Sequence, residues 1–347
     1  MYSEADLQSA VEAGALSPEA AEAFRAHVGA LNASPIVDEE QFRLLTGFND
    51  IFVSIAAVLF LVGCAWAGGS VAPWLGAALV AMSAWGMAEY FTAKRRMALP
   101  SIILLIAFVG GTFSTALGIV FGKTSITEED QGGMAMVALA AAVASGAAWI
   151  HWRRFKVPIT IAAGVAAAVG MLLSLLAATV PDTMRIILPT LLLAGLAIFL
   201  LAMRWDLTDR TRATRRSDVA FWLHLLAAPM IVHPIFVTLG LTEGTVSIGL
   251  ALLVLGIYLL LGAIALIIDR RALMVSALAY VLTAMGTLFR EFGAVSLNIA
   301  LTAIIIGSAL LLLSALWHDA RLRLIQRLPD DWQSRLPVAG FTPPPAS

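Results

Sequence analysis

Ten long apolar runs divide this chain, and short polar loops separate them. A helix needs roughly 20 predominantly apolar residues to cross the hydrocarbon core of a bilayer. Hydrophobic residues make up 60% of the chain and charged residues only 13%, whereas soluble domains carry about 25% charged residues. The sequence therefore predicts an all-α, polytopic integral membrane helix bundle. The ten runs lie near residues 50–68, 72–92, 99–121, 133–152, 157–179, 186–204, 219–240, 246–267, 272–289 and 296–317.

Basic residues are concentrated in every second loop of this arrangement. One set of internal loops holds 13 of them: Lys94, Arg95, Arg96, Arg153, Arg154, Lys156, Arg204, Arg210, Arg212, Arg215, Arg216, Arg270 and Arg271. The other set holds only Lys123, Arg185 and Arg290. The basic-rich side of a membrane protein is normally cytoplasmic. Because ten spans return the chain to its starting side, we expect both termini in the cytoplasm.

The segments outside the runs define three parts, with boundaries at 1–49, 50–317 and 318–347. The first part is acidic, and its signals predict a helix that ends at Gly14 and a second one that starts at Ser17. We expect these two helices to form a hairpin. A third helical segment, from Asp38, is expected to lead into the first span. The hairpin either packs on itself or binds a protein partner.

The C-terminal part begins with a basic amphipathic stretch, 317–327, and ends in a proline-rich tail that contains Pro343, Pro344 and Pro345. A basic amphipathic helix is typical of segments that lie on an anionic leaflet. Anionic lipids are therefore expected partners here and at the basic cytoplasmic loops. The tail is predicted to be extended, either as a plain terminus or as a ligand for a proline-binding module.

The seventh run is unusual because it combines two histidines with two prolines: His224, Pro229, His233 and Pro234. Each proline removes a backbone hydrogen bond and favours a kink. The two histidines are nine residues apart, so at about 100° per residue they face opposite sides of a helix. Two interpretations stay open. The imidazoles bond neighbouring helices, or they have a gating or proton-sensing role beside the kinks.

Five further polar residues are secondary candidates: Asn49, Asp50, Glu89, Arg290 and Glu291. The first two are expected to cap the first span. Glu89 is expected to pair with the basic cluster at 94–96. The last two are expected to form a solvated pair in a short outer turn.

No combination of residues indicates an enzyme, a metal site or a cofactor. The chain has no HExxH pattern, and the remaining histidines are His27, His151 and His318 in or beside cytoplasmic segments. The net charge of −1 and the absence of a basic domain predict no nucleic-acid partner. The single cysteine, Cys64, excludes an intrachain disulfide.

Three stretches resemble proteins of the family called domain of unknown function 2157, which are predicted bacterial membrane proteins. They are the segment 38–45, the start of the first span at 47–52, and the end of the last span at 310–317. The resemblance implies a bacterial inner membrane and no particular activity. Ten spans with internal termini are also similar to the drug/metabolite transporter superfamily. This chain differs from that superfamily in its long N-terminal part and in having no evident internal repeat.

Two classes of function follow from these features. In the first, the bundle is a membrane scaffold or regulatory protein that presents the cytoplasmic hairpin to a partner. In the second, the protein is a permease for a small or lipophilic solute, and its seventh helix moves. The permease hypothesis predicts a cavity at mid-membrane, lined by His224 or His233 and a broken helix.

Overall fold

The computed structural model describes residues 4–24, 48–121, 131–180, 184–209, 214–240, 247–291, 298–333 and 336. Two compact units make up the chain, Met1–Leu44 and Leu45–Ser347. The described residues of the smaller unit form α1 (Glu4–Glu12) and a helical segment over residues 18–24. Gly14 follows α1 with a φ of +71°, and the Ser17 hydroxyl accepts a hydrogen bond from the Ala20 N–H at 3.1 Å. The predicted start and stop signals therefore act where the sequence places them.

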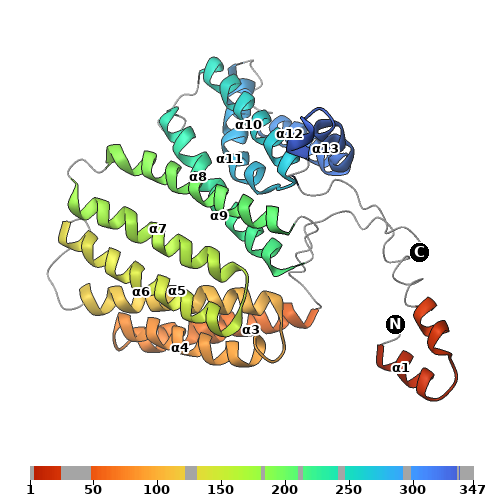
Figure 1. Ribbon diagram of the computed structural model, residues 1–347. Helices are drawn as coiled ribbons and strands as arrows, with labels where there is room; N and C mark the ends of the chain where they lie inside the picture. Colours follow the sequence, from red (N-terminus) through yellow and green to blue (C-terminus); the bar gives the residue numbers. More distant parts are fainter. Residues whose placement is uncertain are drawn as a thin grey trace. The chain divides into compact units, whose positions relative to one another are not determined.

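The larger unit holds one helix for each of the ten apolar runs (Figure 1). They are α3 (Phe48–Gly69), α4 (Pro73–Phe91), α5 (Ala98–Phe121), α6 (Gln131–Phe155), α7 (Ile159–Thr179), α8 (Met184–Thr208), α9 (Arg215–Thr238), α10 (Ile248–Ile268), α11 (Ala272–Glu291) and α12 (Asn298–Ala315). Two shorter helices follow, α13 (Trp317–Ile325) and α14 (Asp330–Gln333). The proline-rich tail and the segment from Asp38 lie outside the described residues.

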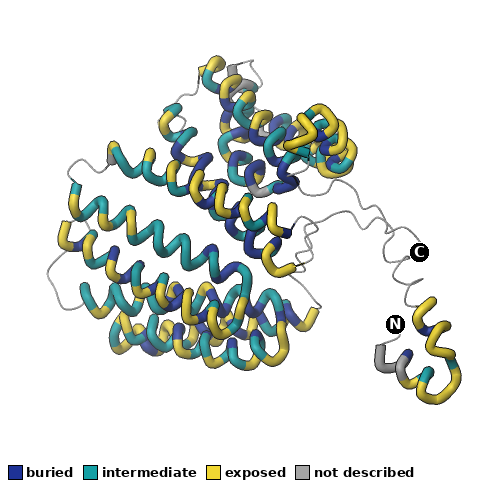
Figure 2. The backbone as a smooth tube through the Cα atoms, in the orientation of Figure 1, coloured by how far each residue is buried: buried dark blue, intermediate teal, exposed yellow. Residues whose placement is uncertain are grey.

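Seven of these helices are long and apolar enough to cross a membrane: α3, α5, α6, α7, α8, α9 and α10. An eighth span results if α12 and α13, which meet at a 69° bend, count as one. Large apolar side chains on these helices are exposed, among them Leu59 at 68% and Phe60 at 56%. Figure 2 shows exposed residues distributed along the helices of the larger unit. Such surfaces are compatible with lipid and not with water. The chain is therefore an integral membrane protein.

Helices that are joined by the basic loops pack extensively on each other, namely α4 with α5, α6 with α7, α8 with α9, and α10 with α11, and α3 packs on α4 as extensively as α10 does on α11. Small residues permit this closeness. A Cβ atom added at Gly195 of α8 would lie 2.9 Å from the Met230 carbonyl carbon of α9. Gly118 of α5 packs in the same way on Trp74 of α4. These two glycines serve packing within the bundle.

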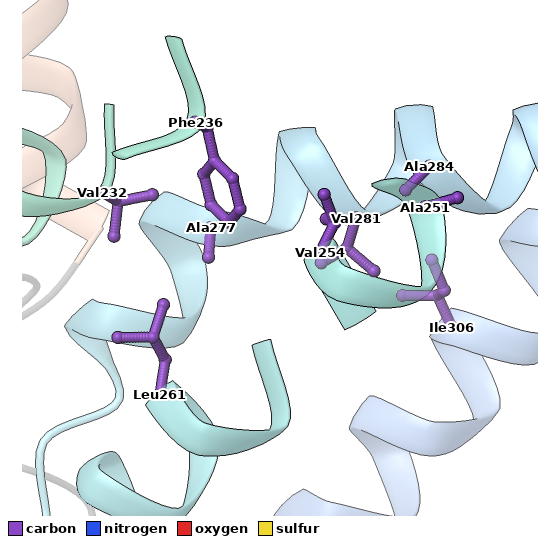
Figure 3. Close-up of a cluster of buried hydrophobic side chains, with 9 residues drawn as sticks. All are labelled: Val232, Phe236, Ala251, Val254, Leu261, Ala277, Val281, Ala284 and Ile306. Carbon is purple, nitrogen blue, oxygen red and sulfur yellow. The ribbon is translucent and has the colours of Figure 1, made fainter. Parts of the chain in front are cut away.

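The seventh helix, α9, is the most buried of the seven candidate spans. Of its most apolar 18-residue stretch, 56% is buried inside the bundle, compared with 11% for the corresponding stretch of α7. It packs against α7, α8 and α11. Figure 3 shows a core cluster in which Val232 and Phe236 of α9 meet side chains of α10, α11 and α12. The helix with the unusual residues is thus a central element of this unit.

Candidate functional site

A buried ionic cluster lies where α8, α9 and the loop between α10 and α11 meet. His224 of α9 places its Nε2 atom 3.0 Å from Oδ2 of Asp206, near the end of α8. The two side chains are 0% and 2% exposed. Phe199 of α8 presents its ring edge-on to the imidazole, with centroids 5.2 Å apart. The sequence singled out His224, and the structure supplies its acidic partner.

Arg270 completes this cluster from the loop between α10 and α11. Its Nε and Nη2 atoms donate to Oδ2 and Oδ1 of Asp206 at 3.2 and 2.5 Å. Nη2 also lies 3.4 Å from the Ser217 carbonyl oxygen of α9. A bidentate arginine–carboxylate pair is among the strongest hydrogen-bonded contacts in proteins. We call Asp206, His224 and Arg270 the Asp206 cluster; it joins three stretches of chain that are distant in sequence.

A sharp backbone turn aims Arg270 into the bundle. Asp269 ends α10 in the left-handed conformation, with a φ of +57°, and the Arg270 N–H donates back to the Ala265 carbonyl at 2.9 Å. Arg96 and Lys156 have the same left-handed conformation after α4 and α6. Such a residue commonly ends a helix because it redirects the chain while its neighbours bond the last carbonyls. Lys156 directly follows α6 in the same way as Asp269 follows α10, whereas α4 ends at Thr92 in the right-handed conformation and Arg96 lies in the loop before α5.

Asp269 itself anchors the last part of the unit. Its Oδ1 atom accepts a hydrogen bond from the Trp317 indole N–H at 2.7 Å, and its Oδ2 lies 3.8 Å from Nη1 of Arg321. Both partners are almost fully buried and belong to α13. Arg321 therefore faces the bundle. In the basic helix that the sequence predicts for lipid contact, Arg323 and Arg327 are the exposed arginines.

The second histidine of α9, His233, has separate surroundings. It is exposed, and its Nδ1 atom lies 2.5 Å from the Tyr280 hydroxyl of α11. Pro229 and Pro234 both lie inside α9, which runs without interruption from Arg215 to Thr238. The broken helix that the permease hypothesis requires is therefore not observed over these residues. Each histidine contacts a different neighbouring helix.

Glu89 pairs with a different arginine from the one expected. The sequence assigned it to the nearby cluster at 94–96, but it accepts hydrogen bonds from Arg154 of α6, at 2.9 Å from Nε and 2.5 Å from Nη2. The two side chains are 36% and 53% exposed. Arg95 of the nearby cluster instead lies over the Tyr90 ring. The contact joins α4 to α6, so tertiary packing and not sequence proximity selects the partner.

The other secondary candidates lie at helix ends. Asp50 is buried in the first turn of α3, at 3% exposure, and Asn49 beside it is exposed. Arg290 and Glu291 are the last residues of α11, and not a short turn as expected.

His151 is a buried polar residue that the sequence analysis assigned only to a cytoplasmic edge. It is 0% exposed on α6, and its Nδ1 atom lies 3.3 Å from the Thr160 hydroxyl of α7. Three aromatic rings surround it, those of Trp85, Phe108 and Phe155. The signal that could have revealed this burial is the position of His151 on the face of α6 that packs against α7. The described residues contain no group of three or more potential metal ligands.

A recess of about 420 Å³ lies between the ends of α6, α8 and α9. Three exposed arginines and two tryptophans contribute to its lining: Arg204, Arg215, Arg216, Trp152 and Trp205. The Glu89–Arg154 pair, the Asp206 cluster and this recess lie where α4, α6, α8 and α10 end, and Asp269 joins α13 to the same end of the bundle. We call this end of the bundle the basic end. Loops that the charge pattern assigns to one side of the membrane thus lie at one end.

Comparison with family models, with curated proteins and with solved structures finds no match for this chain. The resemblance to the domain of unknown function 2157 proteins stays a prediction.

Proposed function

We propose that this protein is a membrane scaffold or regulatory protein of the bacterial inner membrane, with ten spans and both termini in the cytoplasm. Its bundle holds the N-terminal helical unit at the membrane, where that unit binds a protein partner. The proposal includes no catalysis, cofactor or nucleic acid. Anionic lipids contact the arginines of the basic end.

The observation that carries this proposal is the Asp206 cluster. A helix that moves during transport must exchange its contacts, whereas α9 is fixed at His224 by a buried carboxylate that also binds Arg270. Separating a buried ion pair exposes charges to an apolar environment, which is costly. The Asp206 cluster therefore favours a role for α9 as a rigid anchor over a role as a moving element. The two pockets described here are lined by neither His224 nor His233.

The orientation is supported by the contacts at the basic end. Glu89 binds Arg154, and Asp206 binds Arg270, so loops that carry the positive charge contact one another or one another's helices. The positive-inside bias assigns this end to the cytoplasm. Both termini are then cytoplasmic, because ten spans return the chain to its starting side.

The N-terminal unit offers an exposed apolar side chain for a partner. Leu7 and Ala21 are buried, whereas Phe24 is 39% exposed at the end of the second helical segment. We expect a benzoyl-phenylalanine photocrosslinker at Phe24 of the full chain to give one discrete protein adduct in native membranes. Leu7→Asp should remove that adduct by disrupting the unit, while Glu89→Gln, at the bundle, should leave it unchanged. Many adducts of different size, formed to the same extent in Leu7→Asp, would contradict the scaffold proposal.

A permease remains the second candidate, because ionisable residues buried among membrane helices often mark ion pathways. The purified chain in liposomes that contain a pH-sensitive dye tests it. Proton flux that His224→Phe or His233→Ala abolishes, with the helical circular dichroism signal retained, would support the permease. A proton leak that is the same with the native chain, with either variant and without protein would exclude a proton-conducting permease.

A further inference from the structure

A second pocket, separate from the Asp206 cluster, lies between α10, α11, α12 and the start of α13. Its volume is about 130 Å³, several times the roughly 10–15 Å³ that one water molecule requires. Most of its wall is apolar. The lining residues of this kind on α11 and α12 are Met274, Val275, Leu278, Leu310 and Leu313.

Two polar atoms at this pocket lack a partner. The Tyr258 hydroxyl and the Arg271 Nη2 atom are buried and form no hydrogen bond with any described residue. Polar groups that are withdrawn from water normally find a partner, and the requirement is strictest among apolar membrane helices. The pocket therefore presents two unused hydrogen-bond groups, one of them cationic, beside an apolar wall.

The turn between α10 and α11 leaves only Arg271 with an uncompensated charge. Asp269 binds Trp317 and faces Arg321, while Arg270 binds Asp206. The Arg271 guanidinium instead lies over the Trp317 ring, 4.7 Å from its centroid, and forms no ion pair with a described carboxylate. Because Asp269 holds the indole, the guanidinium has a fixed platform. The fold therefore fixes the position of the Arg271 guanidinium, unlike that of a mobile surface side chain.

The pocket opens towards the outer surface of the bundle. Val275, which lines it, is 63% exposed. An exposed valine on an apolar helix of a membrane protein faces lipid. Basic pockets between helices near a membrane surface commonly bind anionic headgroups. A lipid can thus enter this pocket from the bilayer.

We propose that this pocket binds one anionic phospholipid. Its phosphate oxygens accept hydrogen bonds from Arg271 Nη2 and the Tyr258 hydroxyl, and its first methylenes lie against Leu278, Leu310 and Leu313. The phosphate supplies the negative charge that Arg271 lacks, and the acyl chain fills the apolar part. This site rests on the part of the proposed function that brings anionic lipids to the basic end, and it uses neither the N-terminal unit nor the Asp206 cluster.

Native mass spectrometry of the full chain in detergent, titrated with phosphatidylglycerol or phosphatidylcholine, tests the proposal. We expect one phosphatidylglycerol to bind more tightly than any phosphatidylcholine. Arg271→Met should weaken this binding by about ten- to a hundredfold, as expected for loss of a charged hydrogen bond. Tyr258→Phe, which removes only a hydroxyl, should weaken it about two- to tenfold.

Arg153→Met is the matched control, because Arg153 also lies over a tryptophan, Trp149, at 5.8 Å. It removes the same charge and the same kind of contact outside the pocket, and should leave the tight site unchanged. If Arg271→Met misfolds, Tyr258→Phe and the pocket-filling Leu313→Trp decide the question. Equal binding losses for Arg271→Met and Arg153→Met would overturn the proposal, as would no loss with Tyr258→Phe and Leu313→Trp.

A separate titration distinguishes the lipid from free phosphate. Inorganic phosphate alone should not displace the bound phosphatidylglycerol at millimolar concentration, because it lacks the apolar contacts. If inorganic phosphate binds at Arg271 and displaces the lipid, the site is a simple anion site and the phospholipid proposal is wrong.

Discussion

Two ion pairs join helices at the basic end of the bundle, and their surroundings differ sharply. Asp206 and Arg270 are each 2% exposed, whereas Glu89 and Arg154 are 36% and 53% exposed. Both arginines donate through Nε and Nη2 to one carboxylate. The geometry of the two arginine–carboxylate contacts is similar, but their burial differs, and Asp206 also contacts His224. Water screens the exposed pair, while removal of one partner from the buried pair leaves a charge without compensation.

The largest effect is expected from Asp206→Leu, which leaves Arg270 buried and unpaired. Removing one member of a buried pair typically destabilises a protein by about 3–5 kcal/mol. We expect a loss of this size in the free energy of unfolding of the full chain, measured by denaturant titration in detergent with circular dichroism. A loss no greater than that of Glu89→Gln would show that burial does not distinguish the two pairs.

The double variant Asp206→Leu with Arg270→Met sharpens the same comparison. Replacing both partners by apolar residues removes the uncompensated charge, so most of the lost stability should return. A double-mutant cycle measures this coupling directly. Additive losses would mean that the two side chains act independently.

Trp317→Phe should have an intermediate effect. It removes the buried indole N–H that bonds Asp269, and a hydrogen bond to a charged group contributes about 1.5–3 kcal/mol. The same denaturant titration measures the change. Trp149→Phe, at an exposed tryptophan on α6, is the control and should be nearly neutral.

Glu89→Gln should change the free energy of unfolding by less than about 1 kcal/mol, as exposed pairs do. The difference should shrink further as salt is raised, because salt screens exposed charges. A large or salt-independent loss would show that the bilayer surface protects this pair from water.

The smallest expected effect lies in the N-terminal unit, where a fully exposed carboxylate has only local partners. The pKa of Glu19 is lowered by its own backbone N–H and by the Ser17 hydroxyl. The carboxylate therefore stabilises the helix start above its ordinary pKa, and this contribution is lost as the pH falls through the lowered value. Ser17→Ala should raise the Glu19 pKa towards the ordinary value, as measured by carbon-13 NMR titration. An unchanged pKa would exclude the hydroxyl as a cause.

The sequence indicated single residues of the candidate site better than it indicated the contacts between them. It singled out His224 because histidine is rare in an apolar run. It counted Arg270 as a loop charge, and it ended the sixth run at residue 204, before Asp206. Each assignment was reasonable locally, since polar residues at span ends usually face water. The structure extends α8 to Thr208 and turns the chain at Asp269, and these two changes bury both charges.

The same limitation explains the change of partner at Glu89. Sequence spacing favours contacts within a turn or two of a helix, so the cluster at 94–96 was the natural expectation. Arg154 lies 65 residues away and reaches Glu89 only because the ends of α4 and α6 are adjacent.

By itself the sequence determined that the chain is an integral membrane protein of long apolar helices, where each of the ten runs lies, and which loops carry the positive charge. These properties follow from local composition, because the length of an apolar run and the cost of charge in lipid are set residue by residue. Only the tertiary structure decided which charges are buried together and that Arg271 faces a pocket. Those features depend on contacts between residues tens of positions apart, which helix packing selects.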